Sequence, residues 1–232
     1  MIVAMKPSSS QAVRVGGVAG VILAGGQGRR LFPGGDGDKA LVPLAGKPLI
    51  AHAAARFGPQ VFACAISTNS KAQALRRFAM PLLADAIGGP RAIGPLAGIL
   101  TAMEWAKQAA PYCAWLASMP VDAPFVPLDL VARLAGQMQA DEHEVVVVRA
   151  RRRVHFVTAL WSLNLAPKLR RAITEGGMRK VEDFLVAHRT GYLDWPVRGA
   201  DPFLNINTPQ DLARATARLN PPRPVRGSPR RR

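Results

Sequence analysis

A glycine-rich run followed by cations is the feature of this sequence whose chemistry is easiest to interpret. The apolar stretch at residues 18–23 leads directly into Ala24-Gly25-Gly26-Gln27-Gly28, and Arg29, Arg30 and later Lys39 follow. Glycine lets backbone N–H groups approach a ligand closely, and a strand that opens into such a loop beside cations can hold a polyphosphate. The alternative is a surface turn that binds nothing, but a turn needs one or two glycines rather than a cluster backed by cations.

Two common glycine fingerprints for phosphate binding do not fit this run. A dinucleotide-binding fold requires G-x-G-x-x-G after its first strand. Gly26 and Gly28 begin that pattern, but Leu31 stands where the third glycine belongs. A P-loop requires G-x-x-x-x-G-K followed by Ser or Thr, and no lysine of this chain meets that condition. The run therefore predicts a phosphate cradle of a less common kind.

Asp122 is the carboxylate best placed to work beside that cradle. It follows a nearly continuous apolar stretch at residues 112–119, which predicts a strand that ends close to it. Mg²⁺ is commonly held by one or two carboxylates together with substrate phosphates, so Asp122 is our candidate catalytic residue and metal ligand. The alternative role is a helix-capping aspartate before Pro124. Lys39 and Arg30 are the candidate catalytic cations, since phosphoryl-type transfer depends on positioning and charge rather than on a covalent residue.

Two further polar residues follow predicted strands. Asn69 comes after the strand predicted at 61–67, and Asp85 comes after the one at 81–84. Ligands of open parallel sheets bind outside the carboxyl ends of the strands, so both residues are candidates for the same site. The alternatives are that Asn69 caps the next helix and that Asp85 begins a turn. His155 lies within a predicted strand, where a core or edge histidine is the default interpretation, and we assign it no role.

Apolar strands alternate with helical patterns along most of the chain. This order predicts an α/β fold with a three-layer, doubly wound, mostly parallel sheet. One antiparallel strand is expected at 155–161, after a strand at 145–148 and a turn at 149–153. Helices are expected from near Pro48 and at 71–78, 96–107, 128–138, 167–174 and 179–188. A last helix should begin after Thr208, with Pro209 at its first position and Asp211 at its third.

The motifs together resemble the molybdenum cofactor guanylyltransferases. The resemblance begins with Leu23-Ala24-Gly25-Gly26, Arg30-Leu31 and Asp38-Lys39-Ala40-Leu41, and it continues with Leu44-Ala45-Gly46-Lys47-Pro48-Leu49, Asn69, Asp85, Gly94-Pro95-Leu96-Ala97-Gly98, Pro120-Val121-Asp122-Ala123-Pro124 and Asn205-Ile206-Asn207-Thr208-Pro209. It covers residues 17–216 in the family's order. Two features depart from the family pattern: Leu31 replaces the usual methionine, and the loop that contains Gly34-Gly35-Asp36-Gly37 is longer than usual.

The resemblance implies a Rossmann-like nucleotidyltransferase fold and a specific reaction. GMP would pass from GTP to the phosphate of molybdopterin, the pterin of the molybdenum cofactor, and pyrophosphate would leave, with Mg²⁺ as cofactor. The nucleotide contacts implied by matching positions are Leu23, Ala24, Gly25, Lys39, Asn69, Asp85 and Asp122. Proteins that deliver or accept the cofactor are the implied partners, and we expect a monomer. A cytidylyltransferase or a sugar-phosphate nucleotidyltransferase is the alternative on the same fold, although Gly25 replaces the alanine usual in relatives that use CTP.

The charge of the chain raises a different class of function, nucleic-acid binding. The formal net charge is +16 and the isoelectric point about 11.4. Five arginines and no acidic residue lie in residues 220–232, and a second basic cluster spans 149–153. Aromatic residues make up only 6% of the chain and do not interleave with these clusters, as they would in a base-stacking surface. We therefore expect small-molecule substrates rather than nucleic acid.

Length and composition set the remaining expectations. With 232 residues, the chain should form one domain over residues 17–218, with disordered tails at 1–16 and 219–232. It has no apolar run long enough to span a membrane and no recognisable signal peptide, so we expect a cytoplasmic protein without membrane contact. Cys64 and Cys113, both in predicted strands, are expected to be free thiols.

Overall fold

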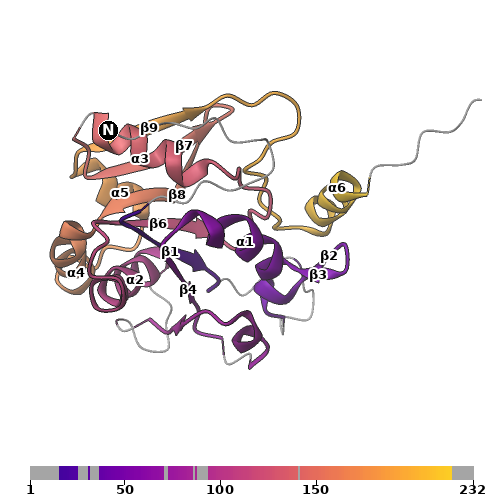
Figure 1. Ribbon diagram of the computed structural model, residues 1–232, viewed down its shortest axis with the longest axis horizontal. Helices are drawn as coiled ribbons and strands as arrows, with labels where there is room; N and C mark the ends of the chain where they lie inside the picture. Colours follow the sequence, from indigo (N-terminus) through magenta and orange to yellow (C-terminus); the bar gives the residue numbers. More distant parts are fainter. Residues whose placement is uncertain are drawn as a thin grey trace, which may run out of the picture.

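The computed structural model describes residues 16–25, 31, 37–70, 73–85, 87, 94–140 and 142–220. These residues form a seven-stranded sheet with helices on both faces, and a separate two-stranded hairpin (Figure 1). The strands are β1 (Val18–Leu23), β2 (Pro43–Leu44), β3 (Lys47–Pro48), β4 (Ala63–Ser67), β5 (Leu82–Leu83), β6 (Trp115–Pro120), β7 (Val145–Ala150), β8 (Arg153–Ser162) and β9 (Thr190–Trp195). The α-helices are α1 (Leu49–Phe57), α2 (Pro95–Ala109), α3 (Leu130–Ala140), α4 (Ala166–Thr174), α5 (Val181–Val186) and α6 (Pro209–Leu219).

The order of the large sheet is β5-β4-β1-β6-β8-β7-β9. β1 pairs in parallel with both β4 and β6, β4 pairs in parallel with β5, and β7 pairs in parallel with β9. β8 is antiparallel to both of its neighbours, β6 and β7. The predicted fold, a mostly parallel three-layer sheet with one antiparallel strand, is therefore confirmed.

Two hydrophobic cores cover the two faces of the sheet. α1 and α3 contribute to one core, and α2, α4 and α5 contribute to the other. Along β7, Val146 and Val148 face the first core, while Val145 and Val147 face the second. A strand buried on both faces needs apolar residues at every position, which explains why the central strands read as continuous apolar runs.

A β-bulge interrupts β8 near the end of β6. Ala159 pairs with Val147, but the next pair along is His155 with Val148, so residues 156–158 lie opposite no residue of β7. On the other side, β6 pairs with β8 only from Ala159 to Ser162. The bulge changes the alternation of side chains, so that Phe156 and Trp161 pack against the same core.

Two predicted elements need correction. The strand expected at 112–119 begins only at Trp115, because Cys113 N donates to Ala110 O in a turn, and Tyr112 is 89% exposed. Cys113 therefore precedes β6 rather than lying in it, although both cysteines are free as expected. The helix expected at 71–78 is a 3₁₀ helix over Gln73–Phe78, with residues 71 and 72 outside the described part of the chain.

Two short strands and an edge strand were not predicted. β2 and β3 form a hairpin whose turn residues, Ala45 and Gly46, both have positive φ (47° and 80°). This hairpin places Pro48 at the N-cap of α1, so the helix begins at Leu49. β9 lies at the edge of the sheet, where exposed residues alternate with buried or half-buried ones from Gly191 onward, and it follows α5 after only a few residues. The remaining short helices are η1 (Lys39–Leu41), η2 (Gly58–Gln60) and η4 (Leu163–Leu165).

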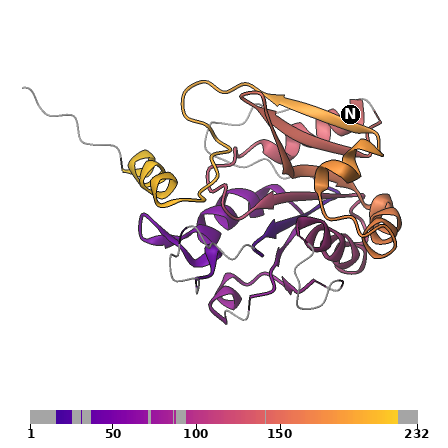
Figure 2. The same cartoon turned by 180° about the vertical axis from the view of Figure 1, so that it is seen from behind.

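The last helix begins where the sequence predicts it. Thr208 Oγ1 accepts from Asp211 N, and Asp211 Oδ2 accepts from Thr208 N, which forms a capping box with Pro209 at the first helical position. α6 lies at one end of the molecule beside the β2–β3 hairpin in both views (Figures 1 and 2). The tails expected at 1–16 and 219–232 lie almost wholly outside the described residues.

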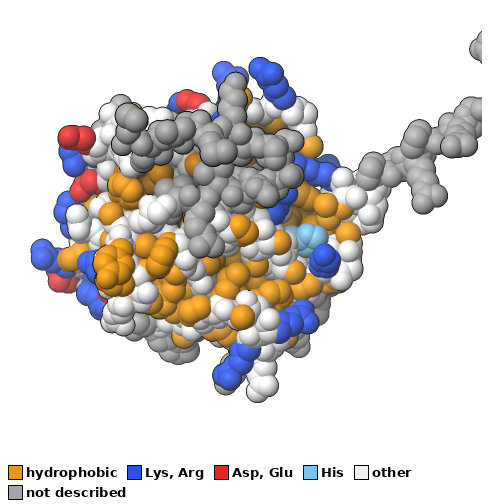
Figure 3. All heavy atoms as spheres, in the orientation of Figure 1, with side chains coloured by type: hydrophobic (Ala, Val, Ile, Leu, Met, Phe, Trp, Pro, Cys, Tyr) orange, Lys and Arg blue, Asp and Glu red, His pale blue; other side chains and the backbone are white. Residues whose placement is uncertain are grey.

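Basic side chains lie around the rim of the face that carries α1, and hydrophobic side chains occupy much of its centre (Figure 3). Within the described residues, no helix combines the length and the apolar character needed to cross a membrane.

Candidate active site

Six predicted site residues line one cavity of about 280 Å³ at the carboxyl ends of the parallel strands. These residues are Leu23, Gly25, Lys39, Asn69, Asp85 and Asp122. Two predicted residues do not line it: Ala24 is buried beside it, and Arg30 lies outside the described residues. The cavity occupies the edge where parallel α/β sheets bind ligands.

The end of β1 is fixed by hydrogen bonds to both neighbouring strands. Ala24 N donates to Ser67 O at 2.8 Å, and Val121 N donates to Leu23 O at 3.0 Å. The N–H group of Ala24 is therefore occupied within the sheet. Gly25 is exposed at the cavity, and a Cβ atom there would meet no atom of the described residues beyond its chain neighbours within 4 Å. The open space beside Gly25 leaves room for a ligand to approach the backbone.

Lys39, Asp122 and Asn207 form the polar centre of this cavity. Lys39 Nζ donates to Asp122 Oδ2 and to Asn207 Oδ1, both at 2.5 Å. The side chains of Lys39 and Asp122 are only 10% and 13% exposed. Because these residues come from η1, from the end of β6 and from the loop before α6, the fold brings together three distant parts of the chain.

The local backbone holds each member of this cluster in place. Asp38 caps η1 by accepting a hydrogen bond from Ala40 N at 2.9 Å, which fixes the start of the turn that carries Lys39. Ile206 N donates to Asp122 O at 2.9 Å, so the loop before α6 is attached to the backbone of Asp122. The carboxylate, the ammonium group and the amide are thus preorganised relative to one another.

Asp122 also has a carboxylate oxygen that is available to bind a metal ion. Its Oδ1 atom is buried and has no hydrogen-bond partner among the described residues. That part of the chain contains no group of three or more His, Cys, Asp or Glu residues able to hold a metal ion by itself. A single carboxylate with a free oxygen fits Mg²⁺, which usually takes one or two carboxylates and completes its shell with substrate phosphates and water.

Asn69 and Asp85 form a reciprocal pair elsewhere in the cavity lining. Asn69 Nδ2 donates to Asp85 Oδ2 at 2.9 Å, and Asp85 N donates to Asn69 Oδ1 at 3.0 Å. Burial raises the pKa of Asp85 above its ordinary value, and the hydrogen bond from Asn69 offsets part of that rise. The pairing orients both side chains, and Asp85 Oδ1 takes no part in it.

Gly98 and Asn207 are site residues to which the sequence analysis gave no role, although both lie in motifs that it noted. Gly98 lines the cavity from α2, and a Cβ atom there would lie 2.5 Å from Ser67 Oγ and 3.0 Å from Leu23 Cδ2. Glycine therefore lets α2 pack closely on the ends of β1 and β4 without displacing these side chains. Asn207 follows Asn205 just before a predicted N-cap. These two amides at the start of a capped helix are the sequence feature that could have identified Asn207 as a site residue.

Fold and site together define the class of protein. A mostly parallel α/β sheet with a lysine–carboxylate cluster and an open glycine backbone at its carboxyl edge is the architecture of a nucleotide-dependent transferase. The family model for the MobA-like NTP transferase domain matches residues 20–190, and this chain belongs to that family.

Individual relatives agree with this assignment. A molybdenum cofactor guanylyltransferase of Rhodopseudomonas palustris (strain HaA2) is 40% identical over 84% of this chain and 89% of its own length. A protein of the same name from Mesorhizobium japonicum is 41% identical over 87% of this chain and 95% of its own length. The crystal structure of molybdopterin-guanine dinucleotide biosynthesis protein A from Archaeoglobus fulgidus has a TM-score of 0.68 and 26% identity, over 88% of this chain and 98% of the other. The predicted family resemblance is confirmed.

Proposed function

We propose that this chain is a molybdenum cofactor guanylyltransferase, which transfers GMP from GTP to the phosphate of molybdopterin and releases pyrophosphate. The two relatives described above carry that name, and they match this chain over most of its length. The observation that supports the chemistry is the cluster of Lys39, Asp122 and Asn207 at the carboxyl edge of the sheet.

The reaction needs positioning and charge more than it needs a base. A phosphate oxygen of molybdopterin attacks the α-phosphorus of GTP, a new P–O bond forms, and the bond to the pyrophosphate leaving group breaks. The attacking oxygen is already ionised near neutral pH, so no side chain has to remove a proton. The protein contributes by holding both substrates in line and by stabilising the negative charge as it shifts to the leaving group.

Asp122 and Lys39 are the residues that we assign to this charge stabilisation. Asp122 Oδ1 would hold Mg²⁺, and the bound ion would neutralise phosphate charge and orient the leaving group. Lys39, positioned by Asp122 and Asn207, supplies a fixed positive charge beside the same phosphates. Gly25 leaves room for the triphosphate to pass close to the backbone. Arg30, outside the described residues, keeps its predicted role as a second cation.

Asn69 and Asp85 are the residues that we assign to the nucleoside part of GTP. Their reciprocal hydrogen bonds fix an amide and a carboxylate at the lining of the cavity, where they can bind ribose hydroxyls or the edge of the base. Leu23 supplies apolar contact at the end of β1. Ala24 acts through the sheet, since its N–H group already binds Ser67 O.

Calorimetry with Mg·GTP, Mg·CTP and Mg·ATP tests the nucleotide assignment. We expect tight binding of GTP only, with a strong dependence on Mg²⁺ that Asp122→Asn removes. Asp129→Asn is the matched control, because Asp129 forms an exposed pair with Arg133 on α3 and does not line this cavity. Preference for CTP would contradict the guanylyl assignment, and an unchanged metal dependence in Asp122→Asn would contradict the metal site.

A further inference from the structure

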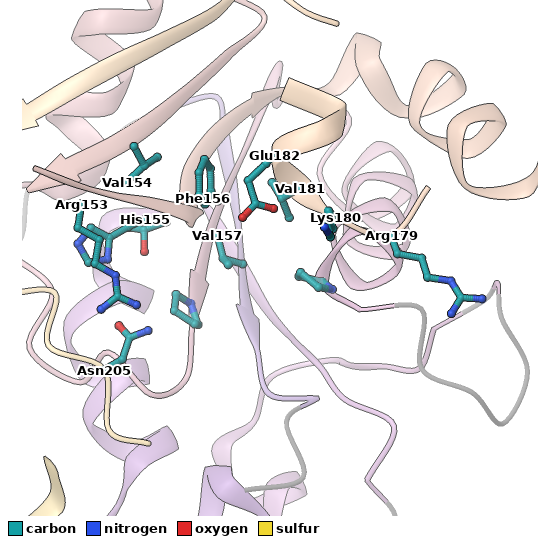
Figure 4. Close-up of a pocket in the computed structure, with 13 residues that line it drawn as sticks. Arg153, Val154, His155, Phe156, Val157, Arg179, Lys180, Val181, Glu182 and Asn205 are labelled. Carbon is teal, nitrogen blue, oxygen red and sulfur yellow. The ribbon is translucent and has the colours of Figure 1, made fainter. Parts of the chain in front are cut away.

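A second cavity of about 330 Å³ adjoins the nucleotide cavity and shares Pro95, Pro120 and Val157 with it. We call it the acceptor cavity, after the substrate proposed to accept GMP. The first half of β8 lines one side of it, and the residues that begin α5 line another (Figure 4). We infer that His155 and Asn205 form a hydrogen-bonding subsite in this cavity that recognises the pterin ring of the acceptor substrate. The inference rests on the proposed function, because it takes the second substrate to be a pterin that carries a phosphate.

Both residues present a buried polar atom without a partner. The side-chain atoms His155 Nε2 and Asn205 Oδ1 are buried and make no hydrogen bond to any described residue. His155 is only 8% exposed and lines the cavity. Buried polar atoms are almost always paired in folded proteins, because leaving one unpaired costs free energy. Two such atoms beside one cavity indicate that a ligand supplies the missing partners.

The ring of His155 is held firmly in its position. It packs against Phe203, with ring centroids 5.2 Å apart, and Phe203 in turn makes a T-shaped contact with Trp195, with centroids 5.5 Å apart. Burial lowers the pKa of His155, and the charge of Arg153 lowers it further, while Asp201 opposes the change. A neutral imidazole has one nitrogen that donates and one that accepts, so it can pair with either kind of group on a heterocycle.

The backbone of β8 adds further hydrogen-bonding groups beside these two atoms. Residues 153–158 extend beyond the pairing with β6, and residues 156–158 also lack a ladder partner on β7 because of the bulge. One carbonyl of this segment, Val157 O, accepts a hydrogen bond from Ser118 Oγ. A free strand edge presents both N–H and C=O groups, which match the mixture of amide, amine and ring nitrogens at the edge of a pterin.

The charges of the lining fit a ligand that carries a phosphate. Arg153, Arg179 and Lys180 line the cavity, and Glu182 is the one acidic residue among the described residues that line it. In Figure 4 the Arg153 side chain extends beside Asn205, while Arg179 and Lys180 lie across the cavity. An excess of cations around hydrogen-bonding groups favours an anionic heterocycle over a neutral one.

The loop from Phe203 to Asn207 connects this subsite with the catalytic cluster. Phe203 packs on His155, Asn205 lines the acceptor cavity, and Asn207 accepts a hydrogen bond from Lys39. Ile206 N, between the two amides, donates to Asp122 O. A pterin bound at His155 and Asn205 would therefore have its position fixed relative to Asp122, which lines the neighbouring cavity.

The test replaces His155 with phenylalanine, which keeps an aromatic ring against Phe203 but removes both nitrogens. The probes are 6-hydroxymethylpterin, followed by its fluorescence, and metal-free molybdopterin in the transfer reaction. We expect His155→Phe to weaken pterin binding and to raise the KM for molybdopterin by about tenfold or more, while the Kd for Mg·GTP and kcat change less than about twofold. His188→Phe is the matched control, because His188 stacks on Phe184 and lines neither cavity.

A second variant covers the possibility that His155→Phe folds poorly. Asn205 lies in a loop and is only partly buried, so Asn205→Ala creates little cavity in the core, and we expect the same pattern with a smaller change in KM. Unchanged pterin binding in both variants overturns the inference. Equal losses of GTP and pterin binding also overturn it, since they indicate a structural role. Wild-type protein that binds the pterin but not GTP contradicts the proposed function and leaves the subsite standing.

Discussion

The two halves of the large sheet build the same edge of the molecule in different ways. In one half, β5, β4, β1 and β6 run parallel, and the segments that follow the strands carry Gly25, Asn69, Asp85 and Asp122. In the other half β8 runs in the opposite direction, so this edge receives the beginning of a strand and the bulge that follows it. Functional candidates therefore lie in loops in the parallel half and within a strand, at His155, in the other half.

Because of this difference, the two halves of the sheet suit different substrates. The parallel half offers open backbone at Gly25 and a lysine–carboxylate cluster, which suit a polyphosphate with its metal ion. The antiparallel half offers unpaired polar atoms and a free strand edge, which suit a planar heterocycle. The two cavities meet at Pro95, Pro120 and Val157, so the reacting phosphates can come together where the halves join.

The largest expected effect comes from removing the charge of Lys39. We expect Lys39→Met to lower kcat by about 10²- to 10³-fold, as for the loss of other fixed groups that stabilise developing charge. Asp122 also loses its partner in this variant, so the melting temperature should fall and should recover more strongly with Mg²⁺ than that of the wild type. Transfer assays and thermal unfolding measure both quantities.

Lys168→Met is the control for this prediction. Lys168 pairs with Glu144 on the surface, and its side chain is 59% exposed. This variant should keep wild-type kcat and the wild-type response to Mg²⁺. A Lys39→Met enzyme with near-normal kcat would contradict the role that we assign to the cluster.

The next effect concerns the packing of α2 on the parallel half. Gly98→Ala places a Cβ atom 2.5 Å from Ser67 Oγ, so we expect a loss of about 1–3 kcal/mol of stability, as for other overpacked positions, and weaker GTP binding. Gly136→Ala is the matched control on α3, where a Cβ atom meets no described residue outside the local helix backbone within 4 Å, and it should gain about 0.5–1 kcal/mol. Chemical denaturation distinguishes the two, and equal stability changes would contradict the packing argument.

A smaller effect is expected at the nucleoside end of the parallel half. Asn69→Ala removes the reciprocal bonds to Asp85, and we expect the Kd for Mg·GTP to rise about fivefold, which corresponds to one hydrogen bond of about 1 kcal/mol. Loss of the bond should raise the pKa of Asp85 further. Pterin binding should not change, because Asn69 and Asp85 do not line the acceptor cavity. A similar loss of pterin affinity would show that the two halves of the sheet do not bind their substrates independently.

The smallest effect is a pH dependence of stability in the antiparallel half. The pKa of His155 is lowered in the folded protein, mainly by burial, so the unfolded chain binds a proton first as the pH falls. The stability that His155 contributes is therefore complete above its ordinary pKa of about 6.5 and is lost as the pH falls below that value. Unfolding curves between pH 8 and pH 5 should show the wild type losing stability relative to His155→Phe. A constant difference would contradict the burial of a neutral imidazole.

Several elements that build the parallel half were predictable because they are locally encoded, although the start of β6 and the β2–β3 hairpin were not. β1 spans the predicted residues 18–23, and the motif Thr208-Pro209 with Asp211 predicts the start of α6 correctly. The convergence of Gly25, Lys39 and Asp122 in one cavity follows from a general rule, since segments after parallel strands meet at one edge.

The antiparallel half was less predictable because its features depend on distant pairing. The β8 bulge is a property of register with β6 and β7, which no local pattern specifies. From the sequence, His155 is interpreted as an ordinary core or edge histidine. The structure shows that its Nε2 atom is buried without a hydrogen-bond partner among the described residues. Asn207 binds Lys39 across 168 positions of sequence, and β9 is an edge strand whose alternation is short and partly polar.

The most direct test of the account follows the α-phosphate of GTP. With GTP labelled at the α-phosphorus, Mg²⁺ and molybdopterin, we expect the label to appear in a guanine dinucleotide form of the cofactor and the released pyrophosphate to be unlabelled. The Asp122→Asn enzyme should bind molybdopterin normally and transfer no label. Absence of labelled dinucleotide with the wild type, or full transfer by Asp122→Asn, would contradict guanylyl transfer at the edge of β6.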